Sequence, residues 1–249
     1  MQEMLRFAQH DRIQIDFLVF IYYRIPIAMN LSTLPALHIV GDSISIHYDP
    51  YLQTMLADVM TYSRKTALDG STDDTGAANG GDSSMVLDYL RALQPDRPFD
   101  VLLINCGLHD IKRDMTTHAL QVPLERYEAN LREILAQAQR LAARTIWVCT
   151  TPVIDERHNR LNTTFQRFEA DVEAYNAAAD RIMQQHDIMT IDLFTFTRHL
   201  GPDVYVDHVH FTDEVRAQQA AFIAECLFVA TTAAGVEASA GTAASERAG

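Results

Sequence analysis

The chain has 249 residues, of which 48% are hydrophobic and 21% charged, as is ordinary for a soluble globular protein with one sizeable core. Its formal net charge of −13 repels nucleic acid phosphates and anionic lipid headgroups. A nucleic-acid or membrane-surface role is therefore disfavoured, and a neutral or cationic small-molecule partner is electrostatically easier.

Residues 1–35 are expected to form an N-terminal extension outside the main domain. Residues 15–29 are strongly apolar but are interrupted by Asp16, Arg24 and Pro26, whereas a membrane-spanning helix needs about 20 apolar residues without such breaks. The segment also lacks the pattern of charge, apolar stretch and cleavage site of a signal peptide. We therefore expect no membrane span and a cytoplasmic location, with secretion left open.

Apolar runs alternate with helical patterns along residues 36–230. Short continuous apolar runs predict buried parallel strands; they lie at 37–40, 100–106, 145–150 and 188–192. Helical spacing of apolar residues recurs at 51–62, 85–93, 124–143, 165–186 and after residue 213. The alternation predicts an α/β fold in which one sheet lies between two layers of helices.

Other segments lack this periodicity. The polar, glycine-rich stretch 69–84 predicts a long loop, of a kind that usually has a functional reason. Residues 231–249 are rich in Ala, Gly, Ser and Thr and are expected to be a disordered tail. Cys106, Cys149 and Cys226 lack the spacing of a metal site, so we expect packing residues in a reducing compartment.

The segment Asp207-His208-Val209-His210 precedes the final helix. In a turn of helical geometry, positions 207 and 210 lie on one side, so the Asp207 carboxylate can reach the His210 ring. A carboxylate on one ring nitrogen leaves the other nitrogen free to take a proton. Alone, this spacing is more typical of a structural histidine than of a catalytic one.

Ser43 follows the first predicted strand, in Gly41-Asp42-Ser43. A residue there stands at the edge where open α/β sheets bind ligands, although a serine after Gly-Asp can also be a helix cap. Together with Asp207 and His210, it supplies the nucleophile, base and orienting acid that acyl transfer requires. Two glycine-containing segments, 80–82 and 107–110, are candidates for the backbone donors of an oxyanion hole.

Four blocks in this order, Gly41-Asp42-Ser43, Gly81, Gly107-x-x-Asp110 and Asp207-x-x-His210, resemble the SGNH (GDSL) hydrolase family over residues 36–228. The resemblance implies a three-layer, flavodoxin-like fold with five parallel strands and no metal or other cofactor. It also implies esterase, lipase, thioesterase or carbohydrate deacetylase activity on a small-molecule ester.

The family's roles transfer block by block. The resemblance implies that Ser43 is the nucleophile, that Asp207 and His210 complete the triad, and that the backbone N–H groups of Ser43 and Gly81 bind the oxyanion. Other residues within or beside these blocks are expected to contact the substrate: Asp42, His47, Gly107 and Asp110.

The third block departs from the family pattern. Members usually have Gly-x-Asn-Asp, with the asparagine as third oxyanion donor, where this chain has His109. An imidazole can also donate a hydrogen bond, whether neutral or protonated. We favour His109 as that donor; a substrate contact or a weakened enzyme are the alternatives.

Several functions stay open. The favoured one is hydrolysis of a small acyl ester, such as a carbohydrate O-acetyl ester, with a thioesterase or lysophospholipase as the alternative. A noncatalytic binding module is also considered, as is a metal-dependent phosphoesterase that would use Asp42, Asp110, Asp207, His208 and His210. Lys112 and Arg113 have the charge to meet an anionic substrate group, but a solvated face is the favoured prediction for both. The oligomeric state is not predicted.

Overall fold

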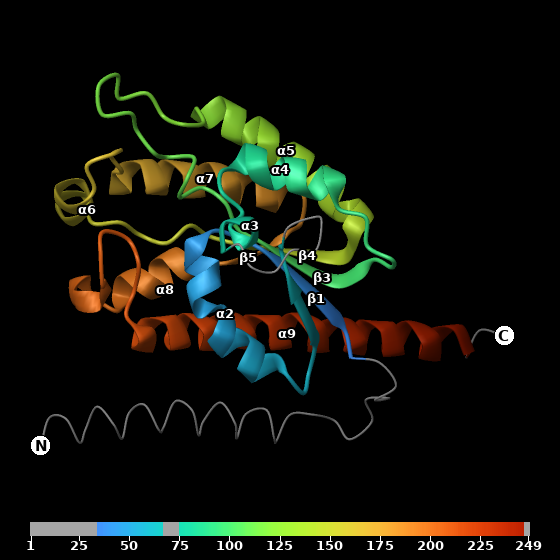
Figure 1. Cartoon of the computed structure of the whole chain (residues 1–249). Coiled ribbons are helices and arrows are strands. Elements are labelled where there is room, and N and C mark those ends of the chain that lie inside the picture. The colour runs from blue at the N-terminus through green and yellow to red at the C-terminus, as the bar shows by residue number, and fades with distance from the viewer. Residues whose placement is uncertain (1–33, 67–74, 247–249) are drawn as a thin grey trace, which may run out of the picture. The chain divides into compact units, whose positions relative to one another are not determined.

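Five parallel strands form one sheet in the order β2-β1-β3-β4-β5 (Figure 1). The computed structural model describes residues 34–66 and 75–246, with side chains described up to residue 230. The strands are β1 (Ala36–Val40), β2 (Thr61–Arg64), β3 (Phe99–Ile104), β4 (Ala142–Val148) and β5 (Met189–Ile191). The predicted five-stranded parallel sheet is therefore confirmed.

The middle strands are buried on both faces, as their continuous apolar sequences predict. Leu37 pairs with Val101 and Val40 with Ile104, and the interior residues of β1 and β3 are almost completely shielded from solvent. Trp147 of β4 is also fully buried, so this single tryptophan belongs to the core. Cys106 and Cys149, at or just beyond the ends of β3 and β4, are buried free thiols.

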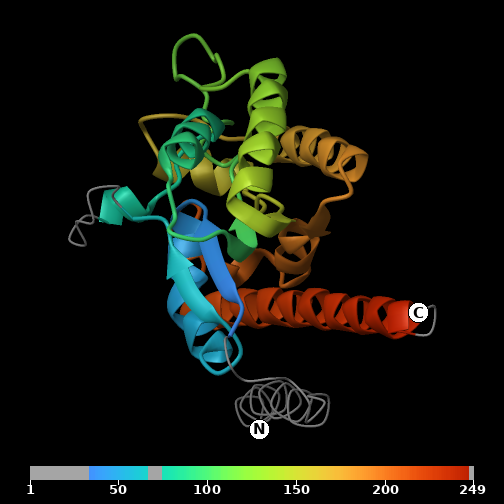
Figure 2. The same cartoon turned by 90° about the vertical axis from the view of Figure 1, so that its right-hand side faces the viewer.

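Helices cover both faces of the sheet. Helices α4, α5 and α7 lie on one face, and α2 and α9 pack together on the other (Figures 1 and 2). The helical elements are α2 (Ser43–Leu56), α3 (Thr75–Ala78), α4 (Ser83–Ala92), α5 (Leu124–Leu141), α6 (Asp155–Leu161), α7 (Glu169–Gln185), α8 (Leu193–His199), the 3₁₀ helix η1 (Pro202–Val204) and α9 (Asp213–Glu246). The three-layer architecture agrees with the prediction.

Some element boundaries differ from the prediction. Helix α2 begins at Ser43 rather than near Tyr51, because the Asp42 carboxylate caps it. The predicted loop 69–84 contains α3 and the start of α4, and residues 67–74 lie outside the described residues. Strand β2 was not predicted from the residues, because it is an edge strand of mixed burial without an apolar run.

The predicted limits of the main domain can be compared with the structure at both ends of the chain. The chain divides into two units between Leu34 and Pro35; the predicted extension falls almost entirely outside the described residues. Helix α9 continues to Glu246 through residues predicted to be disordered, and its alanine-rich sequence has high helix propensity. Among the helices described, none combines the length and apolarity needed to cross a membrane.

Strand order determines where a site can form. In the order 2-1-3-4-5, the chain leaves β1 toward one edge of the sheet and β3 toward the other, which opens a crevice at the carboxyl ends of these two strands. The segments that follow β1 and β3 contain Ser43 and Gly107. This edge of the sheet is therefore where the predicted blocks meet.

Candidate active site

Ser43 is the first residue of α2, directly after β1. The Asp42 side chain accepts a hydrogen bond from the Ile44 N–H (2.9 Å), and the Ser45 hydroxyl donates to the Asp42 carbonyl (2.7 Å). The backbone N–H of Ser43 stands in the first turn, where a helix offers no internal acceptor. The turn therefore holds the Ser43 hydroxyl in place and leaves its N–H available to a ligand.

The structure brings Ser43, His210 and Asp207 into one hydrogen-bonded relay. The Ser43 hydroxyl lies 2.9 Å from His210 Nε2 although the two residues are 167 positions apart. His210 Nδ1 lies 2.7 Å from Asp207 Oδ2. Because a carboxylate only accepts, Nδ1 carries the proton and Nε2 is free to accept from the Ser43 hydroxyl.

The Asp207 carboxylate is itself held by the backbone. Its Oδ1 accepts hydrogen bonds from the N–H groups of Val209 and His210, both at 2.8 Å. Partial burial opposes ionisation of this group, but these two bonds and the bond from the His210 ring lower the pKa of Asp207 below its usual range. Asp207 is therefore an anion throughout the pH range in which His210 can act as a base.

Arg157 of α6 fixes the loop that carries the relay. Its Nε donates to the carbonyl of Asp207 (2.6 Å) and a terminal nitrogen donates to the carbonyl of Tyr205 (3.0 Å). The Tyr205 hydroxyl in turn donates to the Pro152 carbonyl (2.8 Å). Sequence reasoning missed Arg157, because a charged residue on a surface helix does not differ in pattern from a solvated one.

His47 lies one helical turn after Ser43 and packs against His210, with ring centroids 4.5 Å apart. Burial, and then the proximity of His210, lower the pKa of His47 to about 4, so this ring is neutral near neutral pH. Whether His47 also contacts the substrate stays a prediction. What the structure adds is a contact with the His210 ring.

Gly81 has a buried backbone with a φ of +71°, a conformation that favours glycine. Its N–H donates to the side-chain oxygen of Asn79 at 2.9 Å. The adjacent Gly80 N–H donates to the Gly41 carbonyl at 2.8 Å, which joins this loop to the turn before Ser43. The predicted oxyanion donor is thus next to the nucleophile's turn, with an amide oxygen already bound to it.

Asp110 and Asp42, two of the predicted substrate contacts, are buried and bonded to the backbone. Asp110 is fully buried, and its two oxygens accept from the Ser83 N–H at 2.9 and 3.0 Å. Burial raises the pKa of Asp110 to about 7. Asp42 is 2% exposed and caps α2. Both side chains are enclosed by protein and position the loops of the site, and the substrate contact expected of each stays a prediction.

Gly107 and His109 follow β3. Gly107 has a φ of +143°, and an added Cβ would lie 2.3 Å from the Thr150 hydroxyl, so this glycine permits close packing against the end of β4. No described residue forms a hydrogen bond with the His109 ring. Burial, and then the nearby Lys112 and Arg167, lower the pKa of His109 to about 3. His109 is therefore a neutral ring with a free N–H to donate.

Two asparagines, Asn105 and Asn79, lie close to these loops and carry the amide that position 109 lacks. The Asn105 side-chain nitrogen donates to the Val148 carbonyl at 2.9 Å, and Asn105 is 8% exposed. The Asn79 oxygen accepts from Gly81. Asn105 therefore serves the sheet, which leaves His109 as the candidate side-chain donor of the third block.

The residues that a metal-dependent phosphoesterase would use as ligands make other contacts in the structure. His208 packs edge-on against His158 at 4.8 Å, whereas His210 is bound to Asp207 and Ser43. Within residues 34–66 and 75–230, no group of three or more His, Cys, Asp or Glu side chains is arranged to hold a metal ion. This part of the chain therefore gives the metal-dependent reading no geometric support.

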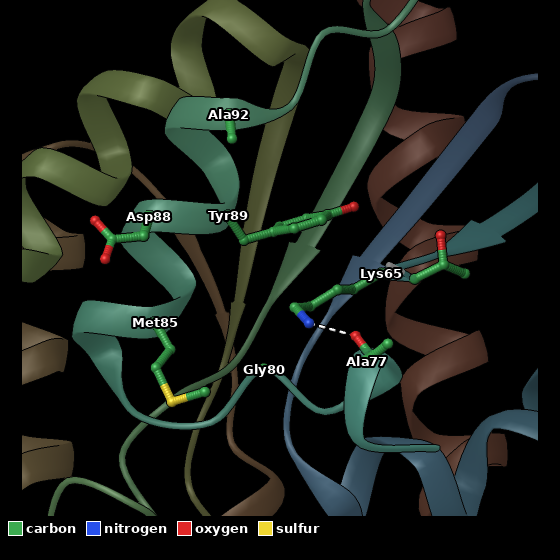
Figure 3. Close-up of a pocket in the computed structure, with 8 residues that line it drawn as sticks. Lys65, Ala77, Gly80, Met85, Asp88, Tyr89 and Ala92 are labelled. Carbon is green, nitrogen blue, oxygen red and sulfur yellow. Dashed lines mark hydrogen bonds between the residues drawn. The ribbon is translucent and has the colours of Figure 1, made fainter. Parts of the chain in front are cut away.

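A separate hollow of about 410 Å³ lies between α3, α4 and the end of β2 (Figure 3). Figure 3 shows Met85, Asp88 and Tyr89 on α4, and Lys65 bonded to the Ala77 carbonyl. The hollow reaches Gly80, but none of Ser43, Asp207 and His210 lines it. The lining consists of Lys65, Thr66, Ala77, Gly80, Met85, Asp88, Tyr89 and Ala92.

A hydroxyl, an imidazole and a carboxylate in this relay define a serine hydrolase. The model of the GDSL-like lipase/acylhydrolase family matches residues 39–217, which is more than half of the chain. The chain belongs to this family and is an ester hydrolase. No curated protein matches it at a significant level.

Solved structures share the fold at low sequence identity. One is a member of the lipolytic G-D-S-L family from Veillonella parvula, with TM-score 0.53 and 17% identity over 76% of this chain and 96% of that chain. An acetyl xylan esterase has TM-score 0.58 and 13% identity over 77% and 98%. Est24, a carbohydrate acetylesterase from Sinorhizobium meliloti, has TM-score 0.53 and 14% identity over 78% and 99%.

Proposed function

We propose that the chain hydrolyses esters of small acyl groups through an acyl-enzyme on Ser43, with His210 as general base and Asp207 as the carboxylate that orients it. The observation that carries this proposal is the relay of 2.9 Å and 2.7 Å hydrogen bonds from Ser43 through His210 to Asp207. Each distance lies within the range that direct proton transfer requires.

The steps follow from the protonation states. Ser43 Oγ attacks the ester carbonyl carbon while its proton passes to His210 Nε2, and Asp207 stabilises the resulting imidazolium. The imidazolium then gives this proton to the departing alkoxide, which leaves as the alcohol. Water repeats the sequence on the acyl-enzyme, releasing the carboxylic acid and restoring Ser43.

The tetrahedral intermediate places negative charge on the former carbonyl oxygen. We assign its stabilisation to the N–H groups of Ser43 and Gly81 and to the neutral ring of His109. A neutral imidazole donates through one nitrogen, and removal of one such donor typically lowers kcat by about 10²–10³. The Asn79 oxygen now on the Gly81 N–H must yield that donor during the reaction.

Small acyl esters are preferred over lipids because the described surface offers little for a long chain. The exposed large apolar side chains come from separate segments: Met85, Met115, Leu161, Val206 and Val229. A lipid substrate calls for a contiguous apolar patch. Acetyl esters of carbohydrates are the first class to test, because two structural neighbours are described as esterases of that kind.

The test compares acetyl, butyryl and long-chain nitrophenyl esters and acetylated xylo-oligosaccharides, with the wild type and Ser43→Ala. We expect turnover that falls with acyl length and is abolished in Ser43→Ala, together with covalent labelling of Ser43 by a fluorophosphonate. Turnover by Ser43→Ala, or no labelling of a folded wild-type protein, would refute the nucleophile. Faster turnover of long-chain esters would favour the lysophospholipase alternative.

A further inference from the structure

Arg167 is a buried cation that forms no ion pair with any described residue, and the buried Asp42 is the carboxylate that acts on its charge from a longer distance. Its side chain is 3% exposed, and its Nε donates to the Leu108 carbonyl at 2.7 Å. The two terminal nitrogens donate no hydrogen bond to any residue that the structure describes, and no described carboxylate forms an ion pair with them. Burial lowers the pKa of Arg167 to about 10, so the side chain is still charged at neutral pH.

The Arg167 backbone is fixed by Asn159 of α6. The Asn159 side-chain nitrogen donates to the Arg167 carbonyl, and its oxygen accepts from the Arg167 N–H, both at 3.0 Å. The guanidinium therefore extends from an anchored backbone. A buried, unpaired charge is costly to a folded protein, and such a cost is typical of residues retained for a ligand.

A second cation lies close by. The Lys112 ammonium is 5.0 Å and the Arg167 guanidinium 4.8 Å from the centroid of the same ring, Phe165. The predicted solvated position of Lys112 is thus corrected, because its side chain is partly buried. Its neighbour Arg113 is occupied differently, by an ion pair with Asp171. Lys112 and Arg167 thus share one ring without an anion bonded to either in the described residues.

Contacts connect these cations to the candidate active site from two sides. On one side, Leu108, which binds Arg167, directly precedes His109. On the other side, a row of four aromatic rings leads from the relay to Phe165. The distances between ring centroids are 6.1 Å from His210 to His208, 4.8 Å from His208 to His158 and 5.7 Å from His158 to Phe165. The positive charge of Arg167 also lowers the pKa of Asp42, which burial raises.

We propose that Arg167 and Lys112 form an anion-binding subsite in the loop cluster that carries Ser43, His109 and His210, and that the ester substrate bears a carboxylate or similar anionic group. The inference rests on the proposed function of Ser43 and names the class of its substrate. An arginine with two free terminal nitrogens matches a carboxylate, which accepts two parallel hydrogen bonds.

The anionic group can belong to the alcohol, as in an acetylated acidic sugar, or to the acyl part, as in a dicarboxylic monoester. Two substrate pairs separate these sources. 4-Acetoxybenzoate and 4-acetoxybenzamide differ by a charge on the alcohol side. The 4-nitrophenyl hemisuccinate and butyrate differ by a charge on the acyl side. For each pair, the ratio of kcat/KM for the anionic ester to that for the neutral ester is measured.

We expect the wild type to prefer the anionic member of one pair by about tenfold or more, the size typical of a hydrogen-bonded charge pair. Arg167→Met should abolish this preference and Lys112→Met should reduce it several-fold, with kcat/KM for the neutral ester changed less. Arg132→Met, which removes an exposed arginine on α5, is the matched control and should leave the ratio unchanged.

The two pairs also decide between outcomes. A preference confined to one pair supports the subsite and assigns the anion to the alcohol or to the acyl group. Equal rates within both pairs, or a preference that survives in both variants, would overturn it. If Arg167→Met fails to fold, Lys112→Met takes its place. Competitive inhibition of the wild type is then also measured, and the subsite predicts that benzoate inhibits more strongly than benzamide. The proposed function is tested separately, because it requires only that the wild type hydrolyses neutral esters and that Ser43→Ala does not.

Discussion

Replacing Asp207 by asparagine tests the role of the carboxylate in the relay. The carboxylate accepts three hydrogen bonds, one at Oδ2 from the His210 ring and two at Oδ1 from the N–H groups of Val209 and His210. An asparagine that keeps both backbone bonds must turn its NH₂ group toward His210 Nδ1. The ring proton then moves to Nε2, which can no longer accept from Ser43. We expect kcat to fall about 10⁴-fold, equivalent to about 5 kcal/mol.

The assay is the initial rate of 4-nitrophenyl acetate hydrolysis at saturating substrate, with the folded fraction of each variant checked by circular dichroism. Asp203→Asn makes the same substitution at an exposed position of η1 and should retain wild-type kcat. A value for Asp207→Asn within tenfold of the wild type would refute the reasoning. His210 would then not depend on this carboxylate for its tautomer.

Three further predictions concern the loops. His109→Ala should lower kcat about 10²–10³-fold while His109→Asn retains most of it, and equal rates for wild type and His109→Ala would show that the ring is no donor. Gly107→Ala should destabilise the fold by about 2 kcal/mol or more in urea unfolding, because of its positive φ and the Thr150 hydroxyl 2.3 Å from the new Cβ, and Gly107→Ala with Thr150→Ala should recover part of this. For Asp110, whose pKa is raised to about 7, the unfolded chain loses the proton near pH 4 and the folded protein near pH 7. The unfolding free energy of the wild type, measured relative to that of Asp110→Asn, should therefore fall as pH rises from about 4 to 7; parallel profiles would contradict the shift.

Much of the fold was predictable because it depends on local pattern. The apolar runs at 37–40, 100–106 and 145–150 correspond to β1, β3 and β4, since strands buried on both faces need such runs. Strand β2 has no such signature, because as an edge strand it presents half of its residues to solvent. The apolar spacing predicts a helix from residue 165, whereas α7 begins at Glu169, because the spacing extends into the segment that holds Arg167.

The candidate site was predictable only as far as the chain's motifs reach. The order of the blocks predicted that Ser43 and His210 meet, and the 2.9 Å separation agrees. Other contacts between distant segments have no sequence motif that predicts them. The hydrogen bonds of Asp110 with Ser83 and of Arg167 with Leu108 are examples. The role of a residue also depends on its burial, which its type does not reveal. Asp42, for example, is buried and caps a helix.

Under the proposed assignment of the Gly81 N–H to the oxyanion, its bond with the Asn79 oxygen has a consequence for selectivity between states of the reaction. In the resting enzyme this donor is satisfied by an uncharged amide. A substrate carbonyl, equally uncharged, gains little by displacing that amide, whereas an oxygen bearing a full negative charge attracts the N–H more strongly. Exchange of partners would therefore coincide with bond formation at Ser43, so that the loop lowers the barrier without tightening the hold on unreacted ester.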